Sequence, residues 1–130
     1  EVSILFTFMR VGQGGTFVDN GGQGGILIGI NKENGCLETD GIDEKGKIYY
    51  KHPETGVIFR NFQLPEWSNL LEMVREMARS LPTVRLIGWD MAYSKQGWVL
   101  VEGNNGGQAI GPQLVYNKGI RELMEKCKII

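Results

Sequence analysis

Residues that mark metal and redox sites are scarce in this chain of 130 residues. Its one histidine cannot supply a histidine-rich metal site. The two cysteines, Cys36 and Cys127, stand far apart and form no CxxC motif. The simplest interpretation is a cytoplasmic protein with reduced thiols.

Long apolar runs are missing as well. No segment approaches the length of a membrane span, and no basic stretch followed by an apolar one opens the chain as a signal peptide would. The first residue is Glu1 rather than methionine, so we expect an excised piece of a longer protein. Targeting information could have been removed with the missing part.

A strong charge of either sign is the third absence. The formal net charge is -1, the isoelectric point is about 5.9, and the basic residues are scattered. Such a chain has no global field for holding a polyanion, so nucleic acid is not an expected partner. With 42% hydrophobic and 22% charged residues, the composition is that of one soluble globular domain over residues 1–130.

Glycine, by contrast, is plentiful and concentrates in residues 12–25, GQGGTFVDNGGQGG. The segment holds neither a Walker lysine motif nor a complete GxGxxG, which excludes a P-loop and a Rossmann turn. Its glycines permit positive φ angles or close approach of the backbone. Asp19 and Asn20 within it either form a plain turn or bind substrate or metal. Asn20 is kept as a candidate cofactor-binding residue.

Strands come first along the chain and helices later, which predicts an α+β fold with an antiparallel sheet. Turn-forming residues separate the predicted strands, which cover residues 2–11, 26–30, 36–40 and 47–52.

Two helices are predicted to cover this sheet. The clearer one lies within residues 64–82, where apolar side chains recur at helical spacing. Pro65 suits its first turn and Pro82 marks its end. A second helix is predicted near the C-terminus. Its apolar stripe, in which Cys127 is a core residue rather than a nucleophile, comprises Ile120, Leu123, Met124 and Cys127.

Residues 88–104, GWDMAYSKQGWVLVEGN, have the pattern of a β-hairpin. We expect a three-residue loop over residues 95–97, with Gly97 in the left-handed conformation that such loops require. Ser94 then faces Trp98. The loop length fixes the register of the whole hairpin, because a slip of one residue sends a side chain to the opposite face.

In this register, one small patch collects three oxygen-bearing side chains. Asp90 lies directly opposite Glu102, with Cβ atoms about 4.5 to 5.5 Å apart. Asn104 stands two residues beyond Glu102 on the same face. Two carboxylates and an amide oxygen form a hard ligand set that suits Mg²⁺ or Mn²⁺, completed by waters and substrate phosphates. The alternative is a solvated strand end whose acids keep an edge soluble.

The hairpin segment IGWDMAYSKQGWVLVEGNNG resembles the metal-binding hairpin of ATP-grasp enzymes, which carries an acidic residue on one strand and Glu-x-Asn on the next. Together with DNGGQGGILIGINKENGCL and HPETG, it resembles the sugar-transfer-associated ATP-grasp family over most of the chain. The resemblance implies that Asp90, Glu102 and Asn104 are magnesium ligands that hold the ATP phosphates. It also implies an ATP-grasp C-terminal subdomain, because nothing here matches the upstream half that grips adenine.

The resemblance further implies a ligase that joins a carboxylate to an amine or similar nucleophile through an acyl-phosphate, in cell-surface polysaccharide synthesis. Cationic side chains stabilise the transferring phosphoryl group in such chemistry. Arg10 is the candidate, because it ends the apolar strand face that carries Phe6 and Phe8 and precedes the glycine segment. The other interpretation is that Arg10 reaches solvent or pairs with a structural acid.

Three further alternatives stay open from the sequence. A degenerate ATP-grasp module could bind a nucleotide, a saccharide or a partner protein without turnover. His52 in HPETG is either bonded to the backbone or a general base. Trp89 and Trp98 are either packing residues or stacking surfaces for a sugar, with packing favoured.

Overall fold

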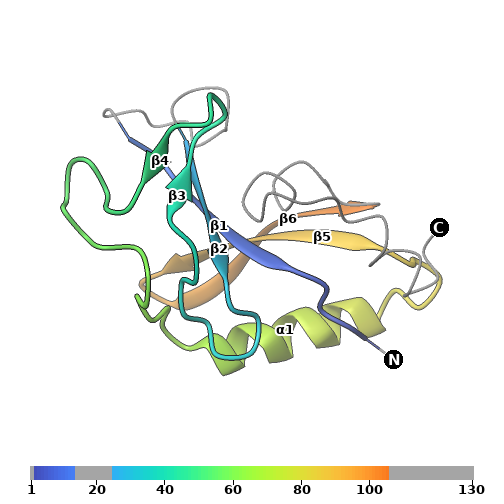
Figure 1. Ribbon diagram of the computed structural model, residues 1–130. Coiled ribbons are helices and arrows are strands. Elements are labelled where there is room, and N and C mark those ends of the chain that lie inside the picture. Colours follow the sequence, from blue (N-terminus) through green and yellow to red (C-terminus); the bar gives the residue numbers. More distant parts are fainter. Residues whose placement is uncertain (1, 14–24, 106–130) are drawn as a thin grey trace.

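The computed structural model describes residues 2–13 and 25–105 (Figure 1). These residues form an α-helix and two antiparallel sheets, which confirms the α+β class. The predicted second helix lies outside the described residues. In chain order, the elements are β1 (Thr7–Val11), β2 (Ile26–Ile30), β3 (Gly41–Ile42), β4 (Ile48–Tyr49), α1 (Trp67–Arg79), β5 (Ile87–Ser94) and β6 (Gly97–Asn105).

The four-stranded sheet has the strand order β1-β2-β3-β4, and every residue of β2 is buried. β1 pairs with β2 from Thr7 opposite Ile30 to Val11 opposite Ile26. The strand predicted over residues 2–11 is therefore too long at its start. β2 ends at Ile30, and the chain then turns at Asn31, whose carbonyl accepts the N–H of Gly35 at 2.8 Å. Residues before Thr7 have no β2 residue left to pair with.

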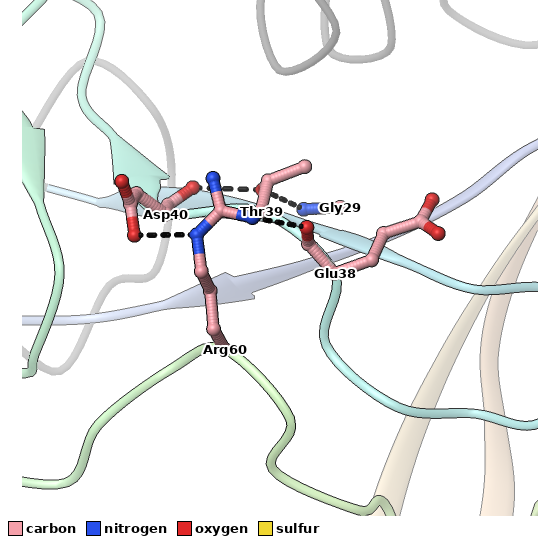
Figure 2. Close-up of polar contacts among 5 residues, drawn as sticks. All are labelled: Gly29, Glu38, Thr39, Asp40 and Arg60. Carbon is pink, nitrogen blue, oxygen red and sulfur yellow. Dashed lines mark hydrogen bonds and ion pairs between the residues drawn. The ribbon is translucent and has the colours of Figure 1, made fainter.

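The prediction of a strand over residues 36–40 is wrong, and Figure 2 shows the reason. The carbonyl of Glu38 accepts a hydrogen bond from Nη1 of Arg60 at 2.9 Å. The N–H of Gly29 in β2 instead donates to the hydroxyl of Thr39 at 2.8 Å. Arg60 Nε also contacts Asp40 Oδ1 at 3.0 Å. Arg60 and Thr39 thus occupy the Glu38 carbonyl and the Gly29 N–H, and beyond an isolated bridge between Ile30 and Leu37 the regular pairing with β2 resumes only at Ile42 of β3.

β3 and β4 are short because Asp43 turns the chain between them. Its Oδ1 accepts the N–H groups of Lys45 and Lys47, each at 2.9 Å, and its Oδ2 accepts the Tyr49 hydroxyl at 3.0 Å. Burial alone raises the pKa of Asp43, but these hydrogen bonds and the charge of Lys45 outweigh it, so the pKa lies below its ordinary value. The strand predicted over residues 47–52 ends at Tyr49, and Lys51 joins only an isolated bridge.

Helix α1 follows the predicted apolar stripe. Trp67 and Leu70 on its inward face are buried, and Arg79 lies in the last turn, where a cation suits the helix dipole. Glu66 is the N-cap residue, in the left-handed conformation with φ 49°. Pro65 therefore precedes the N-cap and does not occupy the first turn as predicted. Within the described ranges, no helix is long and apolar enough to cross a membrane.

The core lies between β2 and α1, and Figure 1 shows α1 running beneath the β5–β6 hairpin. Met91 of β5 and Trp98 of β6 pack against this core from the hairpin. The packing turns one face of the hairpin toward the core and leaves the other facing away from it. The buried members of the core are Ile26, Ile28, Ile30, Leu37, Phe59, Leu64, Trp67 and Leu70.

Candidate functional site

The β5–β6 hairpin brings the two predicted carboxylates together. Asp90 on β5 is the register partner of Glu102 on β6, and Gly88 is the partner of Asn104. Since side chains alternate along a strand, Glu102 and Asn104 share one face of β6. The predicted pairing of Asp90 with Glu102 is confirmed, while the role of these residues as ligands stays a prediction.

The turn of the hairpin differs from the predicted one. Ser94 pairs with Gly97 rather than Trp98, so only two residues lie between the last paired residues. The Ser94 hydroxyl closes the turn by donating to the Gly97 carbonyl at 3.0 Å and accepting the N–H of Gln96 at 3.1 Å. The left-handed conformation expected for Gly97 is present, with φ 95°.

A β-bulge restores the pairing of the acids despite the different turn. Met91 and Asp90 are neighbours on β5, but their partners, Leu100 and Glu102, are separated by Val101 on β6. Val101 is the extra residue of the bulge. One extra residue moves the following side chains of a strand to the other face, because the side-chain period is two.

The bulge decides which way the candidate ligands point. Trp98, before the bulge, lies on the face that packs against the core, together with Met91. A regular ladder continued from the turn would have placed Glu102 and Asn104 on that same inward face. After the bulge they lie on the face of Asp90, and both carboxylate residues are exposed. The site thus depends on a single inserted residue.

The side chains of the acidic pair take no part in the polar contacts that join the described residues. Within the described residues, no hydrogen bond or ion pair engages the side chain of Asp90 or Glu102. Among the same residues, no group of three or more His, Cys, Asp and Glu could enclose a metal. Two carboxylates and the amide oxygen of Asn104 match a hard cation that keeps open positions for waters and phosphates.

A family model described as sugar-transfer associated ATP-grasp matches residues 1–128. The chain belongs to this family. No curated protein and no solved structure matches the chain. The resemblance of the hairpin and glycine segment is thereby confirmed, and membership indicates ATP-grasp-type ligase activity linked to sugar transfer.

The turn end of the ATP-grasp hairpin is anchored to the start of α1. Trp98 Nε1 donates to the Pro65 carbonyl at 2.9 Å, and the Tyr93 hydroxyl donates to Glu66 Oε2 at 2.8 Å. The hydrogen bond to Glu66 raises the pKa of Tyr93, with smaller contributions from partial burial and the Glu66 charge. Trp98 is therefore a packing residue, as favoured. Local sequence patterns carry no signal for this anchor, because its partners lie about thirty residues apart.

His52 in the HPETG segment is bonded to the backbone rather than placed as a general base. Its Nε2 lies 2.9 Å from the Gly12 carbonyl, and its Nδ1 accepts the N–H groups of Glu54 and Thr55 at 3.2 and 3.3 Å. These partners match the tautomer with hydrogen on Nε2. The ring joins the turn after β4 to the start of the glycine segment, a contact that composition alone did not predict.

The other candidates of this ATP-grasp chain lie on the four-stranded sheet or outside the described residues. Arg10 is exposed on β1, opposite Leu27, between Met9 and Val11, which pack against the core. It therefore points away from the core. Asn20 lies outside the described residues.

Proposed function

We propose that Asp90, Glu102 and Asn104 bind Mg²⁺ or Mn²⁺ and, through it, the phosphates of ATP. The observation that carries the proposal is the direct register pairing of two exposed carboxylates that no described side chain neutralises. Like charges directly opposite each other destabilise a hairpin. A divalent cation removes that repulsion and, when bound, neutralises charge on the β- and γ-phosphates.

The proposed reaction is an ATP-dependent ligation through an acyl-phosphate. The oxygen of a substrate carboxylate attacks the γ-phosphorus, the bond from that phosphorus to the bridging oxygen breaks, and ADP leaves. An amine or similar nucleophile then attacks the acyl carbon and displaces phosphate. The side chains of this chain bind and orient the phosphates, and Arg10 is proposed to stabilise the transferring group with its guanidinium.

The proposed setting is cytoplasmic, in the synthesis of a cell-surface polysaccharide, with a small-molecule or saccharide-linked carboxylate or amine as substrate. Family membership linked to sugar transfer supports this setting. The chemistry needs no protein nucleophile, in keeping with a hairpin site made of two carboxylates and an amide.

The test is Mn²⁺ binding in the presence of ATP, measured by electron paramagnetic resonance on the complete natural protein. Glu102→Gln removes one anionic ligand, and we expect the Mn²⁺ affinity to fall by about 10-fold or more, since even the loss of an outer-shell partner of a metal ligand has an effect of that size. Glu72→Gln, which changes an exposed glutamate on α1, is the matched control and should leave the affinity unchanged. Equal affinities in wild type and Glu102→Gln would refute the proposed site.

Turnover separates a ligase from a binding module. ATP-dependent phosphate release with candidate acids and amines should drop strongly in Glu102→Gln and stay at the wild-type rate in Glu72→Gln. Mn²⁺-ATP binding without any phosphate release by the wild type would support the non-catalytic alternative instead.

A further inference from the structure

Behind the proposed metal ligands, an indole ring lies against a glycine. Trp89 on β5 is the register partner of Gly103 on β6. A Cβ atom added at position 103 would lie 2.7 Å from Cζ3 and 3.0 Å from Cε3 of Trp89. Real Cβ contacts essentially never come as close as the first of these distances. The half-buried Trp89 ring therefore fills the space that any other residue at 103 would need.

Space alone explains the glycine at this position. The described glycines with positive φ are Gly35, Gly46, Gly56 and Gly97, so the backbone of Gly103 does not need the freedom that only glycine has. Aromatic rings that cover a glycine on the neighbouring strand stabilise the pairing of strands and pin their register.

The Trp89–Gly103 contact lies next to the proposed ligands. Trp89 directly precedes Asp90, and Gly103 lies between Glu102 and Asn104, so all three candidate ligands are bonded to one of the two contacting residues. Because side chains alternate, the ring and the ligands occupy opposite faces of the hairpin. On the turn side of Glu102, the bulge at Val101 interrupts the ladder. Beyond that bulge, the Trp89–Gly103 contact holds the two strands in register.

We infer that Trp89 and Gly103 are positioning residues, which set the separation of Asp90 from Glu102 and Asn104 and thereby the metal affinity. This inference rests on the proposed function. It adds that the Glu-x-Asn motif of this chain requires glycine at its middle position, because the partner on β5 is tryptophan.

The test measures Mn²⁺ affinity by electron paramagnetic resonance, and the melting temperature by circular dichroism, on the complete natural protein. In Gly103→Ala the new Cβ pushes the ring away and separates the strands, so we expect about 10-fold or more weaker Mn²⁺ binding. Trp89→Leu removes the ring and should weaken Mn²⁺ binding to a similar degree. It provides the test if Gly103→Ala does not fold. Trp89→Phe keeps a ring over Gly103 and should retain affinity within about threefold.

Gly56→Ala is the control for general loss of stability. Gly56 has φ 74° and nothing within 4 Å of an added Cβ, so alanine strains the backbone in the turn after β4, outside the hairpin. It should lower the melting temperature without changing the Mn²⁺ affinity of the folded protein. A folded Gly103→Ala or Trp89→Leu that binds Mn²⁺ within twofold of wild type would overturn the positioning role. If Glu102→Gln leaves the Mn²⁺ affinity unchanged, the proposed metal site itself is overturned. Failure of the positioning role and failure of the metal site therefore give different results.

Discussion

Asp90→Asn should stabilise the metal-free protein, because it removes one of two carboxylates that face each other across the hairpin. Two unit charges about 5 Å apart repel by about 0.8 kcal/mol at the dielectric constant of water. Cross-strand pairs have effects of about 0.2 to 1 kcal/mol, which is the same scale. Since both residues are exposed, we expect the variant to gain about 0.2 to 1 kcal/mol and to melt about 1 to 4 °C higher.

Thermal melts followed by circular dichroism, at neutral pH and low salt with a chelator, measure this gain. In about 1 M NaCl the difference should shrink, because the screening length falls to about 3 Å. Mg²⁺ at about ten times its dissociation constant should stabilise the wild type by about 1.4 kcal/mol and Asp90→Asn by less. The order of the two melting temperatures should therefore reverse when metal is added.

A double-mutant cycle with Glu102→Gln isolates the pair. Each single variant removes the same repulsion, so the stability gains of Asp90→Asn and Glu102→Gln should not add. Glu72→Gln on α1 is the control and should stay within about 0.5 kcal/mol of wild type. A metal-free Asp90→Asn that melts several degrees lower than wild type would refute the reasoning, since Asp90 would then make structural hydrogen bonds.

Two further predictions concern the fold. The folded-state pKa of Asp43 lies below its unfolded value. The stability that Asp43 contributes is therefore present above the unfolded pKa and is lost as the pH falls through the folded pKa. Thermal melts between pH 6 and 2 should show that Asp43→Asn loses less stability in acid than the wild type does. Gly35→Ala should cost about 2 to 4 kcal/mol in urea unfolding, because φ is 78° and the new Cβ would lie 2.4 Å from Cγ of Trp67. Gly46→Ala, with φ 86° and open space, should cost only about 1 kcal/mol, and equal losses would contradict the steric argument.

Local periodicity was enough to predict the helix and the site hairpin. The stripe that includes Trp67 and Leu70 has a helical period, and α1 buries both residues. The pairing of Asp90 with Glu102 was also predicted, but through a three-residue loop with one constant register. The structure reaches the same pair through a tighter turn and a bulge. The pairing was right although the turn was wrong, because the two differences in register cancel.

The sequence by itself determined the α+β class, the extent of α1 to within a few residues, the hard-oxygen character of the candidate site and the family. Each of these depends on residue types and on spacings within a short window. Only the tertiary structure decided the bulge at Val101, the anchor of Trp98 on Pro65, and the interruption of the strand at residues 36–40 by Arg60. These features arise from contacts between distant segments. The hydrogen bond from Arg60 to the Glu38 carbonyl produces no recognisable sequence pattern. Every residue has a backbone carbonyl, so the residue type at the accepting position does not reveal the bond.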